Sequence, residues 1–504
     1  MKGFYKTVFI VTVFSVCEKA LGFLYRIFLS RTIGTEGIGL YQVALSLFSL
    51  ILSACVSGIP ITVSRLMMKY RSENAPKKVG GVITAGLTSA LFITVPVCLV
   101  FFIFHPYLSF LFADNRCMTI FLILLPSIIF TSLYSVLRGV FWGNKDFLPY
   151  SLIELLEELC MIVVGIVLIS LSTTVTGGAI SAGIAVFISL TFSFTLATIV
   201  FFVRKNKLCN PIKLYKPLLS SAIPITAMRT ANTLSISLVS IILPLRLVAS
   251  GLSSEMAMSE FGSAVGQALP LLFIPSTITN SFTLVLIPEI AETFYKKNHV
   301  ILRNNVEKSV KFTIFISCLF IPLFFVCGEE LGIVIFDNAD CGKYLSASSL
   351  MLFFIGLSGI TTSILNSMGQ EKKTLLYYVI SSVFMLASVW FLPKYIGIYS
   401  LITGFAFVYL LSSVLNIKLL NTQCFYKPRI FSFLTYSSLL LLPTVLLSYL
   451  IKNIVLSFCG SVITLFIVAV VSVLTLVLLY CAFDVIDISV MKKRFVLKRK
   501  KAVY

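Results

Sequence analysis

Long apolar stretches recur along the chain, separated by short polar loops. A membrane-spanning helix needs roughly 20 predominantly apolar residues, and fourteen stretches reach that length. They lie near residues 7–30, 40–64, 79–104, 117–140, 150–170, 177–203, 217–248, 261–288, 310–336, 345–367, 374–393, 398–417, 430–451 and 457–482. We therefore expect an all-α membrane protein with 14 transmembrane helices.

The basic residues of the loops lie mainly on one side of the predicted membrane. Of the 40 Lys and Arg residues, 31 fall in the N-terminus, every second loop and the C-terminal tail, and six fall in the alternate loops. Because positively charged loops stay in the cytoplasm, both termini are predicted to be cytoplasmic. The basic tail from Lys492 to Lys501 is expected to be attracted to anionic lipids of the inner membrane surface.

The composition argues against several other functions. With 58% hydrophobic and 12% charged residues, the chain leaves no room for a sizeable soluble domain. We therefore interpret the net charge of +20 as an orientation signal and expect no nucleic-acid binding, which would need a basic face on a soluble domain. Two histidines, scattered cysteines and no phosphate-binding GxxxxGK[ST] loop predict no metal site, cofactor or ATP hydrolysis.

A segment at the end of the fourth stretch returns six helices later. Residues 135–150 (SVLRGVFWGNKDFLPY) and 363–378 (SILNSMGQEKKTLLYY) match with an offset of about 226 residues, the separation of Gly143 and Gly369. Six spans between the copies give both the same orientation, which predicts two parallel six-helix lobes with a substrate path between them. The predicted domains are residues 1–209, 210–425 and 426–504, the last holding helices 13 and 14 and the tail.

Prolines interrupt three of the predicted helices. Proline removes a backbone donor and kinks a helix, so these helices are candidates for bending during transport, with static kinks that improve packing as the alternative. The residues are Gly58 and Pro60 in the second helix, Pro224 and Pro244 in the seventh, and Pro270, Pro275 and Pro288 in the eighth.

Three basic residues lie inside predicted helices, where a charge is expensive. Lys19 and Arg26 are two turns apart on one face of the first helix, about 10 Å along its axis. Arg229 lies in the seventh helix, the equivalent of the first in the second lobe. An Arg or Lys at the bilayer centre costs roughly 2.5 to 3.5 kcal/mol on insertion scales. We expect these three residues to line a cationic cavity between the lobes that binds an anionic substrate.

Acidic residues are expected near these cations. The candidate coupling or gating residues are Glu18, Glu154, Glu157 and Glu158, three of them on one face of the fifth helix, together with Arg138. The acids would pair with the cavity cations, bind a coupling cation or carry a proton. A structural salt-bridge network inside the bundle is the alternative.

Several motifs suggest a family. They are residues 19–41 (KALGFLYRIFLSRTIGTEGIGLY), the Arg138-Gly139-x-Phe141-x-Gly143 pattern with Pro149 and Glu157, and residues 268–275 (ALPLLFIP) with 286–289 (LIPE). This set resembles the stage V sporulation protein B group, in the polysaccharide-transporter branch of the multidrug/oligosaccharidyl-lipid/polysaccharide flippase superfamily.

The resemblance implies a flippase similar to the MurJ-type lipid II flippases, in the bacterial cytoplasmic membrane, and not an enzyme. The implied substrate is a lipid-linked anionic glycan used in cell-wall or spore-cortex peptidoglycan synthesis, with helices 13 and 14 forming a groove for its polyprenyl tail. Lys19 falls on a cavity-lining basic position of the MurJ type, whereas Tyr25 stands at the next basic position and Arg26 one residue later. The identity of the glycan and the driving ion or potential stay open.

Two other functions compete with flipping. Export of small cationic drugs by a relative within the superfamily is disfavoured by a cationic cavity and by two helices beyond the twelve such pumps need. A membrane glycosyltransferase would need catalytic carboxylates near an outer loop. Glu329, Glu330, Asp337 and Asp340 cluster in a predicted loop of about 17 residues.

Overall fold

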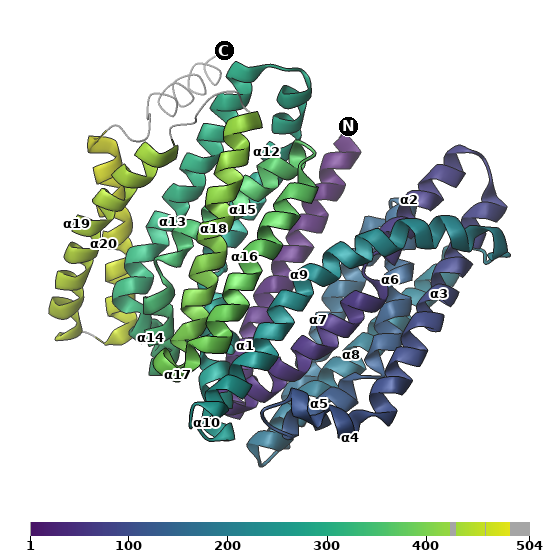
Figure 1. Ribbon diagram of the computed structural model, residues 1–504, viewed down its shortest axis with the longest axis horizontal. Helices are drawn as coiled ribbons and strands as arrows, with labels where there is room; N and C mark the ends of the chain where they lie inside the picture. Colours follow the sequence, from purple (N-terminus) through teal and green to yellow (C-terminus); the bar gives the residue numbers. More distant parts are fainter. Residues whose placement is uncertain (1, 424–429, 459, 484–504) are drawn as a thin grey trace. The chain divides into compact units, whose positions relative to one another are not determined.

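The computed structural model describes residues 2–423, 430–458 and 460–483, and these are almost entirely helical, with no strand among them (Figure 1). Helices satisfy their own backbone hydrogen bonds, which lipid does not do for them. The all-α prediction is therefore confirmed, and each predicted apolar stretch overlaps a helix. The basic tail from Lys492 to Lys501 lies outside the described residues.

The number of spans depends on two local features. Among the described residues, ten helices are long and apolar enough to cross a membrane, or up to twelve if each of two bent pairs is one span. α1 (Lys2–Val56) continues through Gly34, whose backbone is not helical (φ 70°, ψ −177°), and so holds the first predicted stretch and most of the second. α7 (Phe147–Ser170), the fifth predicted span, carries three glutamates and is not among the ten. The count of 14 stays a prediction.

The chain divides into two compact units. The first comprises Met1–Gln267 with Leu386–Leu401, and the second comprises Ala268–Met385 with Ile402–Tyr504. α9 (Tyr215–Ala249) thus packs with the first unit, although residue 210 begins the second predicted lobe. The lobes at residues 1–209 and 210–425 rest on sequence equivalence and stay a prediction.

The first unit is organised around α1, which contacts α7, α8, α9 and α10. Small residues allow the backbones of α1 and α10 to touch, as in many membrane bundles. A Cβ atom at Gly39 would lie 2.1 Å from the carbonyl oxygen of Met258, and one at Gly262 would lie 1.9 Å from that of Thr35. The other elements of this unit are α2 (Ile59–Ser72), α3 (Pro76–Ile103), α4 (His105–Leu108), η1 (Ser109–Leu111), α5 (Arg116–Leu124), α6 (Ser127–Asn144), α8 (Val175–Val203), η2 (Ile212–Leu214), α10 (Ser254–Phe261), the π-helix η3 (Gly262–Ala268) and α17 (Pro393–Ile396).

In the second unit, α13 (His299–Phe336) contacts α12, α14, α15, α19 and α20. Its backbone leaves the helical conformation at Cys327, where it packs against α19 and α20, which lie side by side in Figure 1. The remaining elements are α11 (Leu269–Leu272), α12 (Ile274–Tyr295), α14 (Ala339–Ser348), α15 (Met351–Ser367), α16 (Glu371–Phe391), α18 (Tyr399–Gln423), α19 (Ile430–Leu456) and α20 (Ser461–Ala482), of which α16 and α18 each place a few terminal residues in the first unit.

Both copies of the repeated segment end a helix in the same way. Lys145 after α6 and Gly369 after α15 adopt left-handed conformations, with φ of 61° and 77°. In each copy the next amide donates to the carbonyl five residues back, at 2.9 Å for Asp146 and 3.0 Å for Gln370. The equivalent residues are thus Lys145 and Gly369, so the structural offset is 224 residues, two fewer than the separation of Gly143 and Gly369 in the motif alignment.

The predicted proline breaks are found in two of the three helices. The chain leaves the helix at Ser57 and Gly58, between α1 and α2. The eighth predicted helix is divided into α10, η3, α11 and α12, with Pro270 and Pro275 each near the start of a new helix. Pro224 and Pro244 lie inside α9, which continues through both. Bending during transport stays a prediction.

Candidate functional site

All eight candidate residues lie in the first unit, but only some of them meet. Arg138 at the end of α6 forms an ion pair with Glu154 of α7, with 3.5 Å between Nη1 and Oε1. Its guanidinium also lies 5.3 Å from the ring centroid of Trp142, and this ring meets that of Tyr150 edge-on. Cation–π contacts of this kind add to the ion pair. The alternative of a structural salt bridge is therefore favoured for Arg138 and Glu154.

Glu158 of α7 contacts the face of α1 that carries the candidate cations. A Cβ atom added to Gly22 of α1 would lie 2.8 Å from the Oε1 atom of Glu158. Gly22 is one turn from Lys19 and one turn from Arg26, so Glu158 lies beside the stretch of α1 between them. Within the described part of the chain, Glu158 forms no ion pair closer than 4 Å.

Glu18 and Glu157 complete the acidic group. Glu18 lies close enough to Glu154, Glu158 and Lys19 to interact with their charges. Glu157 faces Ser193 of α8 and also lies close enough to Glu154 and Glu158 to interact with their charges. Glu18 thus lies near Lys19, but of these four acids only Glu154 is ion-paired among the residues described, and its partner is Arg138 and not one of the three candidate cavity cations.

Tyr25 and Arg26 point to different neighbours. Tyr25 is buried, and its hydroxyl lies so close to α7 that a Cβ atom on Gly165 would come within 2.1 Å of it. Arg26 is half-buried and donates from Nη1 to the carbonyl oxygen of Gly266 at 3.1 Å. Gly266 belongs to the π-helix η3, an arrangement that is frequent at functional sites. Tyr25 therefore packs against α7, and Arg26 is the charged residue at this level of α1.

Lys19 and Arg229 are the candidate cations that remain available. Both side chains are exposed, and in the described ranges neither forms a hydrogen bond or an ion pair. Arg229 lies on α9, where the next turn is fixed by a hydrogen bond of 3.2 Å from Thr233 to Ser53 of α1. An anionic group that approached either cation would not have to displace a protein partner.

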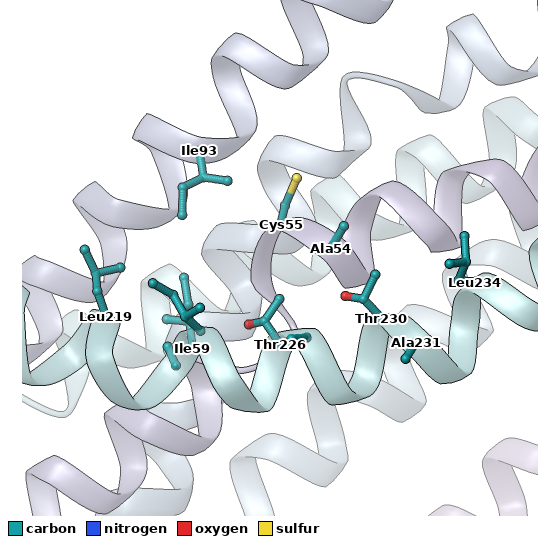
Figure 2. A pocket seen from close by; sticks show the side chains of 12 residues that line it. Ala54, Cys55, Ile59, Ile93, Leu219, Thr226, Thr230, Ala231 and Leu234 are labelled. Carbon is teal, nitrogen blue, oxygen red and sulfur yellow. The ribbon is translucent and has the colours of Figure 1, made fainter. Parts of the chain in front are cut away.

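An apolar pocket of about 480 Å³ lies between α1, α3 and α9 (Figure 2). Figure 2 shows Thr226 and Thr230 of α9 beside Ala54 and Cys55 of α1. Arg229 does not line this pocket, although Thr230 does. The pocket is therefore a separate feature from the predicted cationic cavity, and the sequence pattern gave no signal for it.

A second charged cluster lies around Arg116 and was not predicted from the sequence. Arg116 pairs with Asp114 and with Glu36, both at 2.7 Å, and donates to Thr176 at 3.2 Å. Ser254 donates to Asp114 at 3.0 Å. Burial alone would raise the pKa of Asp114, but the hydrogen bonds from Arg116 and Ser254 hold it below its ordinary value. The cluster ties the start of α10 to α1, α5 and α8, and the Asp-x-Arg spacing was the available signal.

The outer acidic loop expected for a glycosyltransferase is not a loop. Glu329 and Glu330 lie within α13, and Asp337 ends it in a left-handed conformation. Glu330 is buried and pairs at 2.7 Å with Lys452, which lies inside α19, although the predicted span ended at residue 451. Asp340 pairs with Lys343 at 2.9 Å. Two of the four acids, Glu330 and Asp340, therefore belong to separate ion pairs.

Lys452 also explains the kink of α13. Its Nζ atom donates to the carbonyl oxygen of Val326 at 2.8 Å, next to the non-helical Cys327. A kinked helix leaves carbonyl groups that need another donor.

Among the described residues, no group of three or more His, Cys, Asp or Glu side chains could hold a metal ion.

Comparison with known proteins identifies the family. The model of the family described as polysaccharide biosynthesis protein matches residues 4–294. The chain belongs to this family. This match confirms the resemblance drawn from the motifs, and the helices are those of a multi-pass protein of the cell membrane.

Two relatives from Bacillus subtilis (strain 168) support the assignment. Stage V sporulation protein B is 23% identical over 454 residues, which cover 85% of this chain and 86% of the relative. Lipid II flippase MurJ is 25% identical over 350 residues, 61% of each chain.

Solved structures show the same fold. The inward closed conformation of lipid II flippase MurJ aligns with a TM-score of 0.77 at 15% identity, covering 95% of this chain and 100% of that one. The inward-facing conformation of a multidrug resistance MATE family transporter of the MOP superfamily aligns with a TM-score of 0.67 at 13% identity, covering 81% and 94%. The fold is thus shared by lipid flippases and drug transporters.

Proposed function

We propose that this member of the family translocates a polyprenyl-diphosphate-linked cell-wall precursor across the cytoplasmic membrane by alternating access. The observation that carries the proposal is the pair of exposed cations, Lys19 on α1 and Arg229 on α9, that lack partners in the described part of the chain. Charges in a membrane helix are retained where they have a function. The sequence relationship to a lipid II flippase supports the same class of substrate.

In this proposal the diphosphate of the headgroup binds Lys19, Arg26 and Arg229. Phosphate oxygens form strong charge-assisted hydrogen bonds with such donors. Arg26 would exchange the Gly266 carbonyl for a phosphate oxygen, whereas the other two cations bind directly. Glu18 and Glu158 lie beside the stretch of α1 that carries Lys19 and Arg26 and would respond to neutralisation of these cations, while Arg138 and Glu154 hold α6 against α7.

The membrane potential is sufficient to favour outward movement of an anionic headgroup. An inside-negative potential supplies about 2.3 kcal/mol per charge per 100 mV. A coupling cation or proton remains an alternative driving force, with the acids of α7 as its binding residues. The polyprenyl tail would stay in lipid, in a groove formed by α19 and α20.

The proposal predicts that headgroup translocation depends on the two exposed cations. In proteoliposomes containing a fluorescent lipid-linked precursor, Lys19→Ala and Arg229→Ala should each slow translocation by at least about tenfold, because a hydrogen bond to a charged group contributes 1.5–3 kcal/mol. Lys343→Ala is the matched control, since it removes an exposed basic residue whose ion pair with Asp340 is on the surface. Unchanged translocation in both variants would contradict the assignment.

Drug export is the second candidate, because the fold also matches a MATE family transporter and the unit contains an apolar pocket. An accumulation assay with a cationic dye in the same proteoliposomes separates the two. Drug export would be favoured by two results together. The unmodified protein would not translocate the headgroup, and dye uptake would persist in variants that lack Lys19 and Arg229.

A further inference from the structure

A second pocket, of about 860 Å³, lies at one end of the first unit. It is formed by the turn between α2 and α3, the first two turns of α3 and the segment that follows α8. Four cations line it, namely Arg71, Lys77, Lys205 and Lys207. This end carries the loops that the charge distribution predicts to be cytoplasmic.

The pocket wall is held in place by contacts between three chain segments. Arg71 donates from Nη2 to Asn144 Oδ1 at 2.6 Å, and Asn144 donates to Asn206 Oδ1 at 3.2 Å. A Cβ atom at Gly80 would lie 2.5 Å from the carbonyl oxygen of Lys207, so the segment after α8 lies directly on α3. The amide of Cys209 donates to Thr84 at 3.2 Å. The pocket is therefore preformed.

The positive charge of the pocket is not neutralised by the described part of the protein. The side chains of Lys77, Lys205 and Lys207 form no hydrogen bond or ion pair there, and no acidic residue lines the pocket. The nearby Glu73 pairs instead with Lys78, which is not a lining residue, at 3.6 Å. The N-terminal end of α3 adds the partial positive charge of its helix dipole.

The pocket also has an apolar side. Val79, Gly80 and Ile83 extend it along α3 from the cationic end toward the interior of the span. A cationic mouth with an apolar floor fits a ligand that has a phosphate group at one end and a hydrocarbon chain at the other. Basic pockets between spans on the cytoplasmic side bind anionic lipid headgroups in this way.

We propose that this pocket binds an anionic phospholipid of the cytoplasmic leaflet. The phosphodiester accepts hydrogen bonds from Lys77, Lys205 and Lys207, with Arg71 fixed beside them by Asn144, and an acyl chain lies along α3. The site does not include Lys19, Arg26 or Arg229, so it is independent of the proposed substrate site. A bound lipid would join α2, α3 and the end of α8.

The test compares two triple variants with the same change of charge. Lys77→Gln/Lys205→Gln/Lys207→Gln removes the pocket lysines, and Lys78→Gln/Lys213→Gln/Lys216→Gln removes three exposed lysines that do not line it. Each protein is purified from nanodiscs of phosphatidylcholine with phosphatidylglycerol, and the retained lipid is counted by native mass spectrometry. We expect the pocket variant to retain phosphatidylglycerol at least about tenfold less than the control variant.

A second measurement uses the unmodified protein. Cys209 lines the pocket, so its alkylation, measured relative to Cys481 of α20, should be slower with phosphatidylglycerol than with phosphatidylcholine alone. Equal lipid retention by the two variants, or equal Cys209 alkylation in both lipids, would overturn the proposal. So would displacement of the lipid by millimolar inorganic phosphate, which would assign a soluble anion, or selective loss of the lipid-linked precursor, which would assign the substrate.

Discussion

At the scale of single residues, the second unit contains a buried ion pair between Glu330 and Lys452. Both side chains are largely buried, with 11% and 16% of their surface exposed, and the lysine also binds the Val326 carbonyl. Removing one partner of such a pair leaves an uncompensated buried charge, which costs more than the pair itself contributes. The pair therefore fixes α19 against the kink of α13.

We predict that Lys452→Met destabilises the protein by about 3–5 kcal/mol, and that Lys452→Met/Glu330→Gln recovers most of this loss. Thermal unfolding in detergent measures both. Lys343→Met, which breaks the exposed pair with Asp340, should change stability by less than about 1 kcal/mol. Equal effects of Lys452→Met and Lys343→Met would show that the Glu330 pair does not stabilise the helices.

At the scale of helices, the close approach of α1 and α10 depends on glycine. The carbonyl oxygen of Met258 occupies the position that a side chain on Gly39 would need, and that of Thr35 does the same for Gly262. The hydrogen bond between Thr35 and Ser259, at 2.6 Å, and the Arg116 cluster join the same two helices. The contact is thus specified by several independent residues.

We predict that Gly39→Ala lowers stability by about 1–3 kcal/mol, because the added methyl group forces the backbones apart. Gly359→Ala in α15 is the matched control, since no atom lies within 4 Å of its Cβ position, and it should be neutral or stabilising by up to about 1 kcal/mol. Thermal unfolding midpoints of the two variants check this. A smaller loss for Gly39→Ala than for Gly359→Ala would contradict the observed packing.

At the scale of the whole molecule, the sequence indicated the helices but not their partners. Hydropathy marks helices well because lipid leaves the backbone no other way to satisfy its hydrogen bonds. It ended one helix at residue 451, since Lys452 is charged, yet α19 continues to Leu456. Spacing placed Lys19 and Arg26 on one face of α1, but it does not report that Arg26 meets Gly266 or that Glu154 meets Arg138.

The orientation predicted from charge is also tested on the whole molecule. Single cysteines introduced at Lys145, Lys205 and Lys372 should react with an impermeant reagent only after the membrane is opened, whereas one at Lys343 or Lys394 should react in intact cells. The expectation follows from the retention of basic loops in the cytoplasm. The prediction places an odd number of spans between residues 145 and 343, and hence these residues on opposite sides of the membrane. Labelling of Lys145→Cys and Lys343→Cys from the same side would contradict it.

The π-helix η3 has a mechanical consequence. A π-turn contains one residue more than an α-turn, so its conversion to an α-helix would rotate everything that follows by about 100° and move it by about 1.5 Å. The chain passes from the first unit to the second directly after Gln267. Arg26 holds the wider turn through Gly266. Under the proposed function, an anion that drew this guanidinium away would remove the contact that holds the wider turn at the entrance to the second unit.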